Sequence, residues 1–232
     1  MKPGLANKEI IEQTTSFAFF EGRVVTYNDE ISISHPLEGL KLEGAVIADK
    51  LYALLGKIKK EEIEIKVEGS EILISSGRIK AGLTLQSEIK LPLGEEVMTK
   101  SKWKALPEKF TKSVSFVMTS CSRDMSRAVL TAVHINKDGF IEASDSYRVA
   151  RCDLGEEMPV KTFLLPASSA VEMVKFNPTY IAEGKGWIHF KTEEDSIMSC
   201  RIFEDEYPDT KPHLKNERNS DYPTKDCRRS IG

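Results

Sequence analysis

One order of structural patterns occurs twice along this chain of 232 residues. In each half, a turn between two alternating strands is followed by a helical pattern and then by the turn of a second hairpin. Matching landmarks lie about 120 residues apart, namely Gly22 with Gly139, Val46 with Pro166, and Gly77 with Asp195. We therefore expect a duplicated unit, because repeats of this kind decide the architecture. The alternative is that any two β-rich domains share such hairpins.

The spacing of apolar residues predicts the elements of each half. Period-two alternation predicts strands, and spacings of three and four predict helices. In the first half we expect a helix over 46–60 and strands over 16–20, 23–27, 30–34, 62–67, 71–75 and 79–85. In the second half we expect helices over 104–117 and 166–176, and strands over 128–135, 140–144, 147–152, 187–191 and 197–203.

These patterns predict two domains and two segments without a core. We expect a first domain over residues 1–88 and a second over 103–212. Residues 89–102 are rich in Lys, Glu, Gly and Pro, which is typical of a linker. Residues 213–232 are polar and aperiodic, which predicts a disordered tail.

The bulk composition is that of a soluble globular protein, with 40% hydrophobic and 30% charged residues. The net charge of −3 gives no global attraction to nucleic acid, so any DNA contact needs a local basic surface. The N-terminus lacks the apolar core of a secretory signal. No apolar run approaches the roughly 20 residues needed to span a bilayer. We expect a cytoplasmic protein that makes no membrane contact.

The four cysteines are far apart and form no C-x-x-C pair. This spacing argues against a zinc site and against a disulfide framework, so we expect reduced thiols and no bound metal. They are Cys121, Cys152, Cys200 and Cys227.

Catalytic motifs are missing from the sequence. It contains no Gly-rich phosphate loop, no H-E-x-x-H and no G-x-S-x-G. His134, Asp145 and Cys152 are the one nucleophile set that can be imagined. His134 and Cys152 lie in alternating strands, with no helix N-terminus nearby to lower the pKa of a thiol. We therefore expect that the protein is not an enzyme.

Four short segments resemble, in order and spacing, the second domain of the bacterial DNA sliding clamp family, the beta subunits of DNA polymerase III. Residues 143–150 (ASDSYRVA) resemble the family signature A-T-D-G-H-R-L-A. Residues 106–110 (LPEKF) resemble the first helix of that domain, 163–166 (FLLP) its strand-to-helix entry, and 207–209 (YPD) its closing F/Y-P-D. The resemblance covers residues 103–212 well and 14–88 more weakly.

The resemblance implies an α+β fold of repeated sliding-clamp domains, with antiparallel sheets outside and helices on one face. In the family, six such domains form a ring whose helices hold double-stranded DNA by phosphate charge, without reading bases. The implied function is a processivity factor that encircles DNA and tethers the replicative DNA polymerase, with no cofactor. The polymerase and the clamp loader would dock by short apolar peptides in a cleft on the second domain.

The resemblance places DNA-binding residues on the helices and on one loop. Lys50 and Lys57 are two helical turns apart in the first domain, and the family's DNA-contacting loop falls at Arg123 and Arg127. For any single lysine the alternative is an ordinary solvated face. The full set is Lys50, Lys57, Lys109, Lys112, Arg123, Arg127 and Lys175.

The resemblance also places the partner-peptide cleft. The matching positions are Leu130, Ser144, Ser146, Tyr147, Arg148, Val149 and Pro208. Their apolar floor with a few orienting polar groups is typical of a binding site. Ser146 and Tyr147 depart from the family, which has Gly and His there. For Leu130 and Val149 the alternative is ordinary strand core.

The chain departs from the family at both ends. The family's first domain begins with a strand and a helix before the stretch that Lys2–Gly4 matches. We therefore expect one helix in the first domain, with its apolar residues Leu51, Leu54, Leu55 and Ile58 partly uncovered. The family's third domain, which supplies half of the cleft, also has no match in this chain.

Two readings of these departures follow. Two domains per chain would build a six-domain ring as a trimer. The alternative is a truncated or rearranged gene, of phage origin, whose product closes no ring, and the polar C-terminal end favours it. A different class of function stays open as well, namely a peptide-binding module that docks replication proteins without enclosing DNA.

Overall fold

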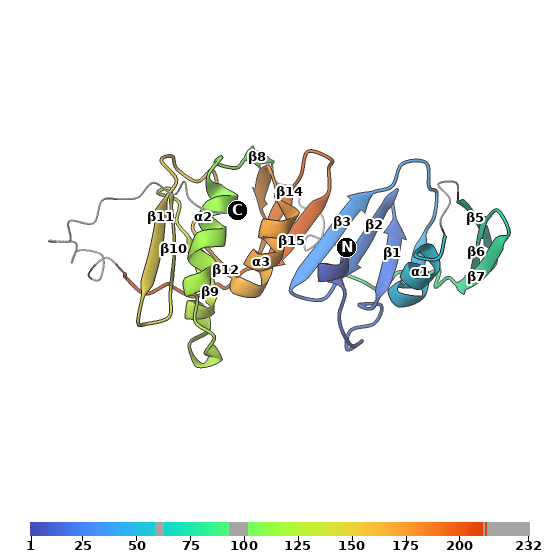
Figure 1. Cartoon of the computed structure of the whole chain (residues 1–232), viewed down its shortest axis with the longest axis horizontal. Coiled ribbons are helices and arrows are strands. Elements are labelled where there is room, and N and C mark those ends of the chain that lie inside the picture. The colour runs from blue at the N-terminus through green and yellow to red at the C-terminus, as the bar shows by residue number, and fades with distance from the viewer. Residues whose placement is uncertain (59–62, 93–101, 211, 213–232) are drawn as a thin grey trace.

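The structure is a computed structural model, and it describes residues 1–58, 63–92, 102–210 and 212. The described part of the chain is elongated, with its first and second halves side by side along the long axis (Figure 1). The elements of the first half are η1 (Lys2–Gly4), β1 (Ser16–Phe20), β2 (Arg23–Tyr27), β3 (Ile31–Pro36), β4 (Gly44–Ile47), α1 (Ala48–Leu55), β5 (Glu64–Glu68), β6 (Glu71–Ser76) and β7 (Ile79–Thr84).

The second half holds more elements. They are β8 (Lys104–Ala105), α2 (Phe110–Val117), η2 (Met118–Ser120), η3 (Met125–Thr131), β9 (Ala132–Ile135), β10 (Phe140–Ser144), β11 (Val149–Asp153), β12 (Phe163–Pro166), α3 (Ala167–Phe176), β13 (Tyr180–Glu183), β14 (Trp187–Lys191) and β15 (Ile197–Arg201). None of the helices in the described ranges combines the length and apolar character needed to span a bilayer.

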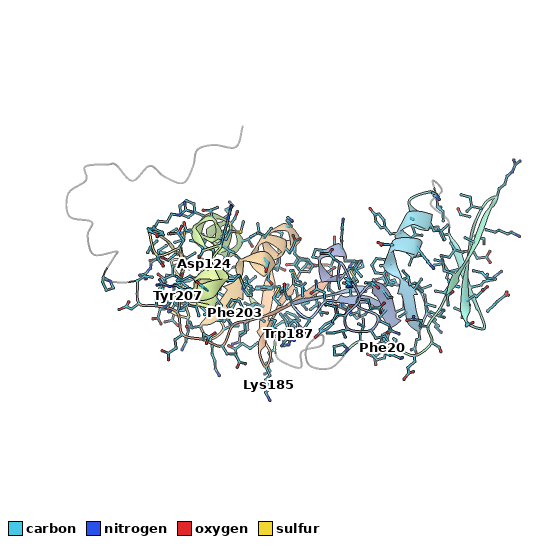
Figure 2. The ribbon with its side chains drawn as sticks, turned by 90° about the horizontal axis from the view of Figure 1, so that it is seen from below. Phe20, Asp124, Lys185, Trp187, Phe203 and Tyr207 are labelled. Carbon is cyan, nitrogen blue, oxygen red and sulfur yellow. The ribbon has the colours of Figure 1, made fainter. Side chains whose placement is uncertain are left out.

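Three antiparallel sheets form the framework. The largest has the order β4-β1-β2-β3-β15-β14-β13-β8, so it runs through both halves of the chain. The sheets β5-β6-β7 and β11-β10-β9-β12 lie toward the opposite ends of the long axis (Figure 1). The helices α1, α2 and α3 lie on one side of the molecule, and the turn at Lys185 projects from the other (Figure 2). This is the expected α+β arrangement.

The junction between the halves is a strand pair. β3 and β15 are antiparallel, and their register sets Ile33 opposite Met198. Side chains reinforce the pair from both sides. Arg23 Nη1 donates to Asp195 Oδ2 at 2.8 Å, and Arg201 Nη2 donates to Asp29 Oδ1 at 2.6 Å. The two halves are therefore parts of one hydrogen-bonded framework.

The topology supports the duplication that the sequence predicts. β1–β4, α1 and β5–β7 of the first half correspond in order to β9–β12, α3 and β13–β15 of the second. An isolated bridge follows the last strand of each unit, Ala45 to Gln86 in the first and Leu164 to Phe203 in the second. Within the described residues, β8 and α2 have counterparts in no part of the first half.

The main hydrophobic core lies between the sheets of the second half and the helices α2 and α3. Phe110 of α2 meets Phe190 of β14 with ring centroids 6.1 Å apart. Ile31 and Ile33 of β3 are buried in this same cluster, although they belong to the first half. A second cluster, including Leu51, fills the first half between β1, α1 and the sheet β5-β6-β7.

Two predicted helices begin later than expected. Residues 46 and 47 belong to β4, and α1 begins at Ala48 and ends at Leu55. Residues 104 and 105 form β8, and α2 begins only at Phe110. β4 leads directly into α1, whereas residues 106–109 lie between β8 and α2, and the spacing of apolar residues alone does not mark either helix start. The prediction of strand over 128–131 was wrong too, since these residues complete η3.

The prediction that the apolar residues of α1 are partly uncovered is correct for some of them and wrong for others. Leu51 is buried, Leu54 and Ile58 are half-buried, and Leu55 is exposed. Tyr52, which the sequence did not single out, is 77% exposed. Of the predicted linker and tail, residues 93–101 and 213–232 lie outside the described residues.

Candidate functional site: a cleft on the second half

All seven residues expected to form the peptide cleft line one cavity of about 510 Å³. The β10–β11 loop supplies three of them, β10, β11 and η3 supply one each, and the segment after β15 supplies Pro208. Arg127, Asp209 and Thr210 complete the lining. Residues as distant in the sequence as Arg127 and Thr210 therefore meet at this site.

The β10–β11 loop is held by its own acidic residue. The Asp145 carboxylate accepts hydrogen bonds from the backbone N–H groups of Tyr147 and Arg148, each at 3.1 Å, and from Arg148 Nε at 3.0 Å. Its environment raises the pKa of Asp145 by desolvation, but these hydrogen bonds outweigh that effect and the pKa lies below its ordinary value. The loop is therefore a fixed turn that presents its side chains to the cleft.

The cleft has an apolar floor and a polar rim. Leu130 is 6% exposed and Val149 is half-buried, whereas Tyr147 is 98% exposed at the mouth. Arg127 Nη1 donates to Ser146 Oγ at 3.1 Å, and Arg148 Nη2 donates to the Thr119 carbonyl at 3.0 Å. Such a groove suits a short peptide with an apolar side chain for the floor and an aromatic or acidic group for the rim.

A buried ionic cluster that the sequence did not reveal lies beside the cleft. Glu142 of β10 is 2% exposed, and its carboxylate accepts hydrogen bonds from Arg151 Nη2 and from Thr210 Oγ1, both at 2.6 Å. His134 Nδ1 lies 2.8 Å from Glu142 Oε1. Burial raises the pKa of Glu142, but the hydrogen bonds from His134, Thr210 and Arg151 outweigh it, so the pKa lies below its ordinary range.

The basic residues expected to face DNA are all exposed, but they do not form one helical surface. Lys50, Lys112 and Lys175 lie on α1, α2 and α3, which share one side of the molecule. Lys57 lies beyond the end of α1, so the predicted helix face shared with Lys50 is wrong. Lys109 occupies the N-cap position of α2.

The two arginines of the predicted DNA-contacting loop, Arg123 and Arg127, line different cavities. Arg123 lines a second cavity of about 420 Å³ together with Ser168 and Phe203. Arg127 lines the peptide cleft. The loop therefore reaches the cleft through one of its two basic residues.

The imagined nucleophile set is not assembled. His134 lies in the register row of Glu142, and Cys152 pairs with Ile141, whose side chain is in the core on the other face of the sheet. Asp145 is committed to its own loop. Elsewhere, desolvation by burial raises the pKa of Cys121 to about 12, which keeps that thiol protonated.

This architecture defines a class. Paired repeats with helices on one side and a sheet that runs through their junction make up the fold of a DNA sliding clamp. The solved structures that the chain resembles are beta subunits of DNA polymerase III. A Bacillus subtilis sliding clamp matches with 18% identity and a TM-score of 0.74, over 91% of this chain and 62% of that one. A Streptococcus pneumoniae beta chain matches with 19% identity and a TM-score of 0.76, over 91% of this chain and 63% of that one.

A third neighbour carries a ligand. The Helicobacter pylori beta clamp bound to a DNA ligase peptide matches with 11% identity and a TM-score of 0.75, over 91% of this chain and 64% of that one. The chain thus spans less than two thirds of these clamps. No protein-family model and no curated protein sequence matches the chain.

Proposed function

We propose that this protein is a sliding clamp, a processivity factor that encircles double-stranded DNA in the cytoplasm and tethers a replicative polymerase. The observation that carries the proposal is the convergence of all seven expected cleft residues on one cavity, within a sliding-clamp fold. The Helicobacter pylori clamp binds a DNA ligase peptide. By analogy, the polymerase and the clamp loader would dock here by short peptides, and the protein would act by topology rather than by catalysis.

The free sheet edges support self-association into a ring. In the described residues, β7 and β11 are terminal strands of sheets toward opposite ends of the molecule (Figure 1). By the internal repeat, β7 corresponds to β15 and β11 to β3, and β3 pairs with β15 inside the chain. The same pairing between copies, β11 of one with β7 of the next, would close three chains into a ring.

Light scattering at micromolar concentration tests the ring. We expect a mass near three times the chain mass of 26.0 kDa. A monomer at that concentration would rule out spontaneous ring formation. A β7 variant with Gly82→Pro removes one backbone N–H and should lower the mass to that of the monomer if this edge forms the contact.

The basic side chains on the three helices would hold DNA through phosphates. Such binding depends on salt, and each lost contact lowers the slope of log K against log salt by about one. We expect Lys112→Ala to lower the slope and Lys185→Ala, on the opposite side of the molecule, to leave it unchanged (Figure 2). Equal slopes for the two variants would contradict a DNA-facing helical side.

A second function is favoured by the position of the cleft. Its lining lies wholly within residues 127–210, so a single copy carries it. The chain could therefore dock replication proteins without enclosing DNA. Retention on closed circular but not on linear DNA, after loading, supports the ring. Peptide binding without retention on either DNA supports the docking module.

A further inference from the structure

The segment that follows β15 crosses the outer face of the sheet β11-β10-β9-β12. Three side chains of that sheet contact the segment. His134, Glu142 and Arg151 lie in one register row across β9, β10 and β11. The neighbouring row, with Ile135 and Ile141, points into the core instead. A row of polar side chains on the outer face would ordinarily be open to water, yet Glu142 is 2% exposed. The crossing segment provides that cover.

The segment is attached at two points. The ring of Tyr207, which Figure 2 labels, stacks on His134 with centroids 4.7 Å apart. Three residues later, Thr210 Oγ1 donates to Glu142 Oε2 at 2.6 Å and accepts from Arg151 Nη2 at 2.9 Å. We call these five residues, with their contacts, the clasp. Charge-assisted bonds to a buried carboxylate are among the stronger hydrogen bonds in proteins.

Two residues lie between the attachment points, and both line the cleft. They are Pro208 and Asp209. Pro208 is exposed and thus makes little burial contact of its own that would fix its position. The clasp residue Tyr207 precedes it directly, and the clasp residue Thr210 follows two positions later. The contacts of Tyr207 and Thr210 with the sheet therefore fix the position of Pro208 in the cleft wall.

We propose that the clasp is a positioning device, in which Glu142, Arg151 and His134 act through Tyr207 and Thr210 to hold Pro208 as one wall of the cleft. This inference rests on the proposed peptide-binding function. Glu142 and Arg151 touch no peptide in this arrangement. They affect peptide affinity through the crossing segment. If Pro208 were mobile, ordering it on peptide binding would cost free energy and weaken the affinity.

The test measures two quantities on the full chain. One is the affinity of a fluorescein-labelled hexapeptide ending in Leu-Phe, by fluorescence anisotropy. The other is hydrogen exchange of the amides over 207–210, without peptide. Thr210→Val removes the hydroxyl at nearly constant volume, and Thr210→Ser keeps it. Thr84→Val, on the exposed face of β7, is the matched control.

We expect Thr210→Val to speed exchange over 207–210 and to weaken peptide binding about tenfold. Thr210→Ser should restore both, and Thr84→Val should change neither. The effect should also disappear in a Pro208→Ala background, since the clasp acts through that side chain. A merely structural role predicts equal losses in both backgrounds.

Unchanged affinity in Thr210→Val, with a wild-type chain that binds the peptide, overturns the positioning role and leaves the proposed function standing. A wild-type chain that binds no such peptide overturns the proposed function and the positioning role together. The exchange measurement separates these results, because it reports attachment of the segment whether or not a peptide binds.

Discussion

Ser146 is held at a φ of 75°, in the left-handed region that L side chains rarely adopt. Clamps of the resembled family have Gly at this position, and the structure supplies the physical reason. The tight β10–β11 turn needs a positive φ, which glycine adopts without steric cost. The serine hydroxyl compensates in part by accepting a hydrogen bond from Arg127.

We expect Ser146→Gly to stabilise the protein by up to about 1 kcal/mol, because the strain of the left-handed conformation is removed. Urea unfolding measures this. Ser87→Gly is the control, since Ser87 is not among the residues with positive φ. That change should destabilise slightly through the added freedom of the unfolded chain. Destabilisation by Ser146→Gly would show that the hydroxyl contact outweighs the strain.

His189 gives the fold a pH dependence. Its side chain is fully buried, and burial lowers the pKa of His189 to about 4. The unfolded chain binds this proton near pH 6.5 and the folded chain near pH 4, so the unfolded state gains stability as pH falls through that window. The contribution of neutral His189 to the free energy of unfolding is fully present above pH 6.5, and about 3 kcal/mol of it is lost by pH 4.

Denaturant unfolding at pH 7 and pH 4.5 checks this prediction. The stability difference between the two pH values should shrink in His189→Gln, which keeps a side chain able to hydrogen-bond Ser199, the partner of His189 Nδ1 at 2.7 Å. An equal pH dependence in wild type and variant would assign the acid sensitivity to other groups.

The resemblance to the clamp family implied the cleft residues, whereas nothing in the sequence indicated the clasp. Signature residues such as Ser144 and Arg148 are close together in sequence, so they lie at or beside one loop. Glu142 has only the pattern of an outward-facing strand residue. Its burial depends on Thr210, which lies 68 positions away. No local pattern records that contact.

At the scale of elements, two turns occupy matching places in the repeat and differ in their surroundings. Gly22 joins β1 to β2 with a φ of 71°, and Gly139 precedes β10 with a φ of 87°. A Cβ at Gly22 would meet no atom within 4 Å. A Cβ at Gly139 would lie 2.1 Å from the Glu156 carbonyl oxygen, so backbone must move.

We expect Gly22→Ala to cost about 1 kcal/mol, from backbone strain alone. Gly139→Ala should cost at least twice as much, roughly 2 kcal/mol or more, because a steric clash adds to the strain. Thermal unfolding of the two variants gives the comparison. Equal losses would mean that the loop around Glu156 yields without cost.

The helix boundaries show where sequence patterns stop being informative. Val46 and Leu106 continue the apolar spacing of the helices that follow them, yet Val46 lies in a strand and Leu106 precedes α2. Strand pairing decides the matter. Val46 pairs with Phe17 of β1, and Ala105 pairs with Tyr180 of β13. These partners are distant in sequence.

At the scale of the whole molecule, the halves share a sheet and a core. Ile33 belongs to β3 but is buried, at 4% exposure, among the residues of the second half. Truncation of the Ile33 side chain would leave a cavity whose walls come from both halves, so it would lower the stability of both. The protein should therefore unfold as one cooperative unit.

Calorimetry of two variants tests this coupling. Ile33→Ala at the junction and Ile74→Ala in the core of the first half should each cost about 2–4 kcal/mol and shift one common transition. Ile74 is 1% exposed, which makes the two substitutions comparable. Two separate transitions, with only the earlier one shifted by Ile74→Ala, would contradict a single unit.

Alternation and helical spacing, which are local in the chain, were enough to predict the class of fold and the duplication. The candidate cleft residues came from the resemblance of short motifs to the clamp family. The continuous sheet through β3 and β15, the helix starts and the burial of Glu142 beneath Thr210 became visible only in the folded chain. Those features depend on strand edges and covering segments that meet after folding, and a pattern along one chain carries no record of its distant neighbours.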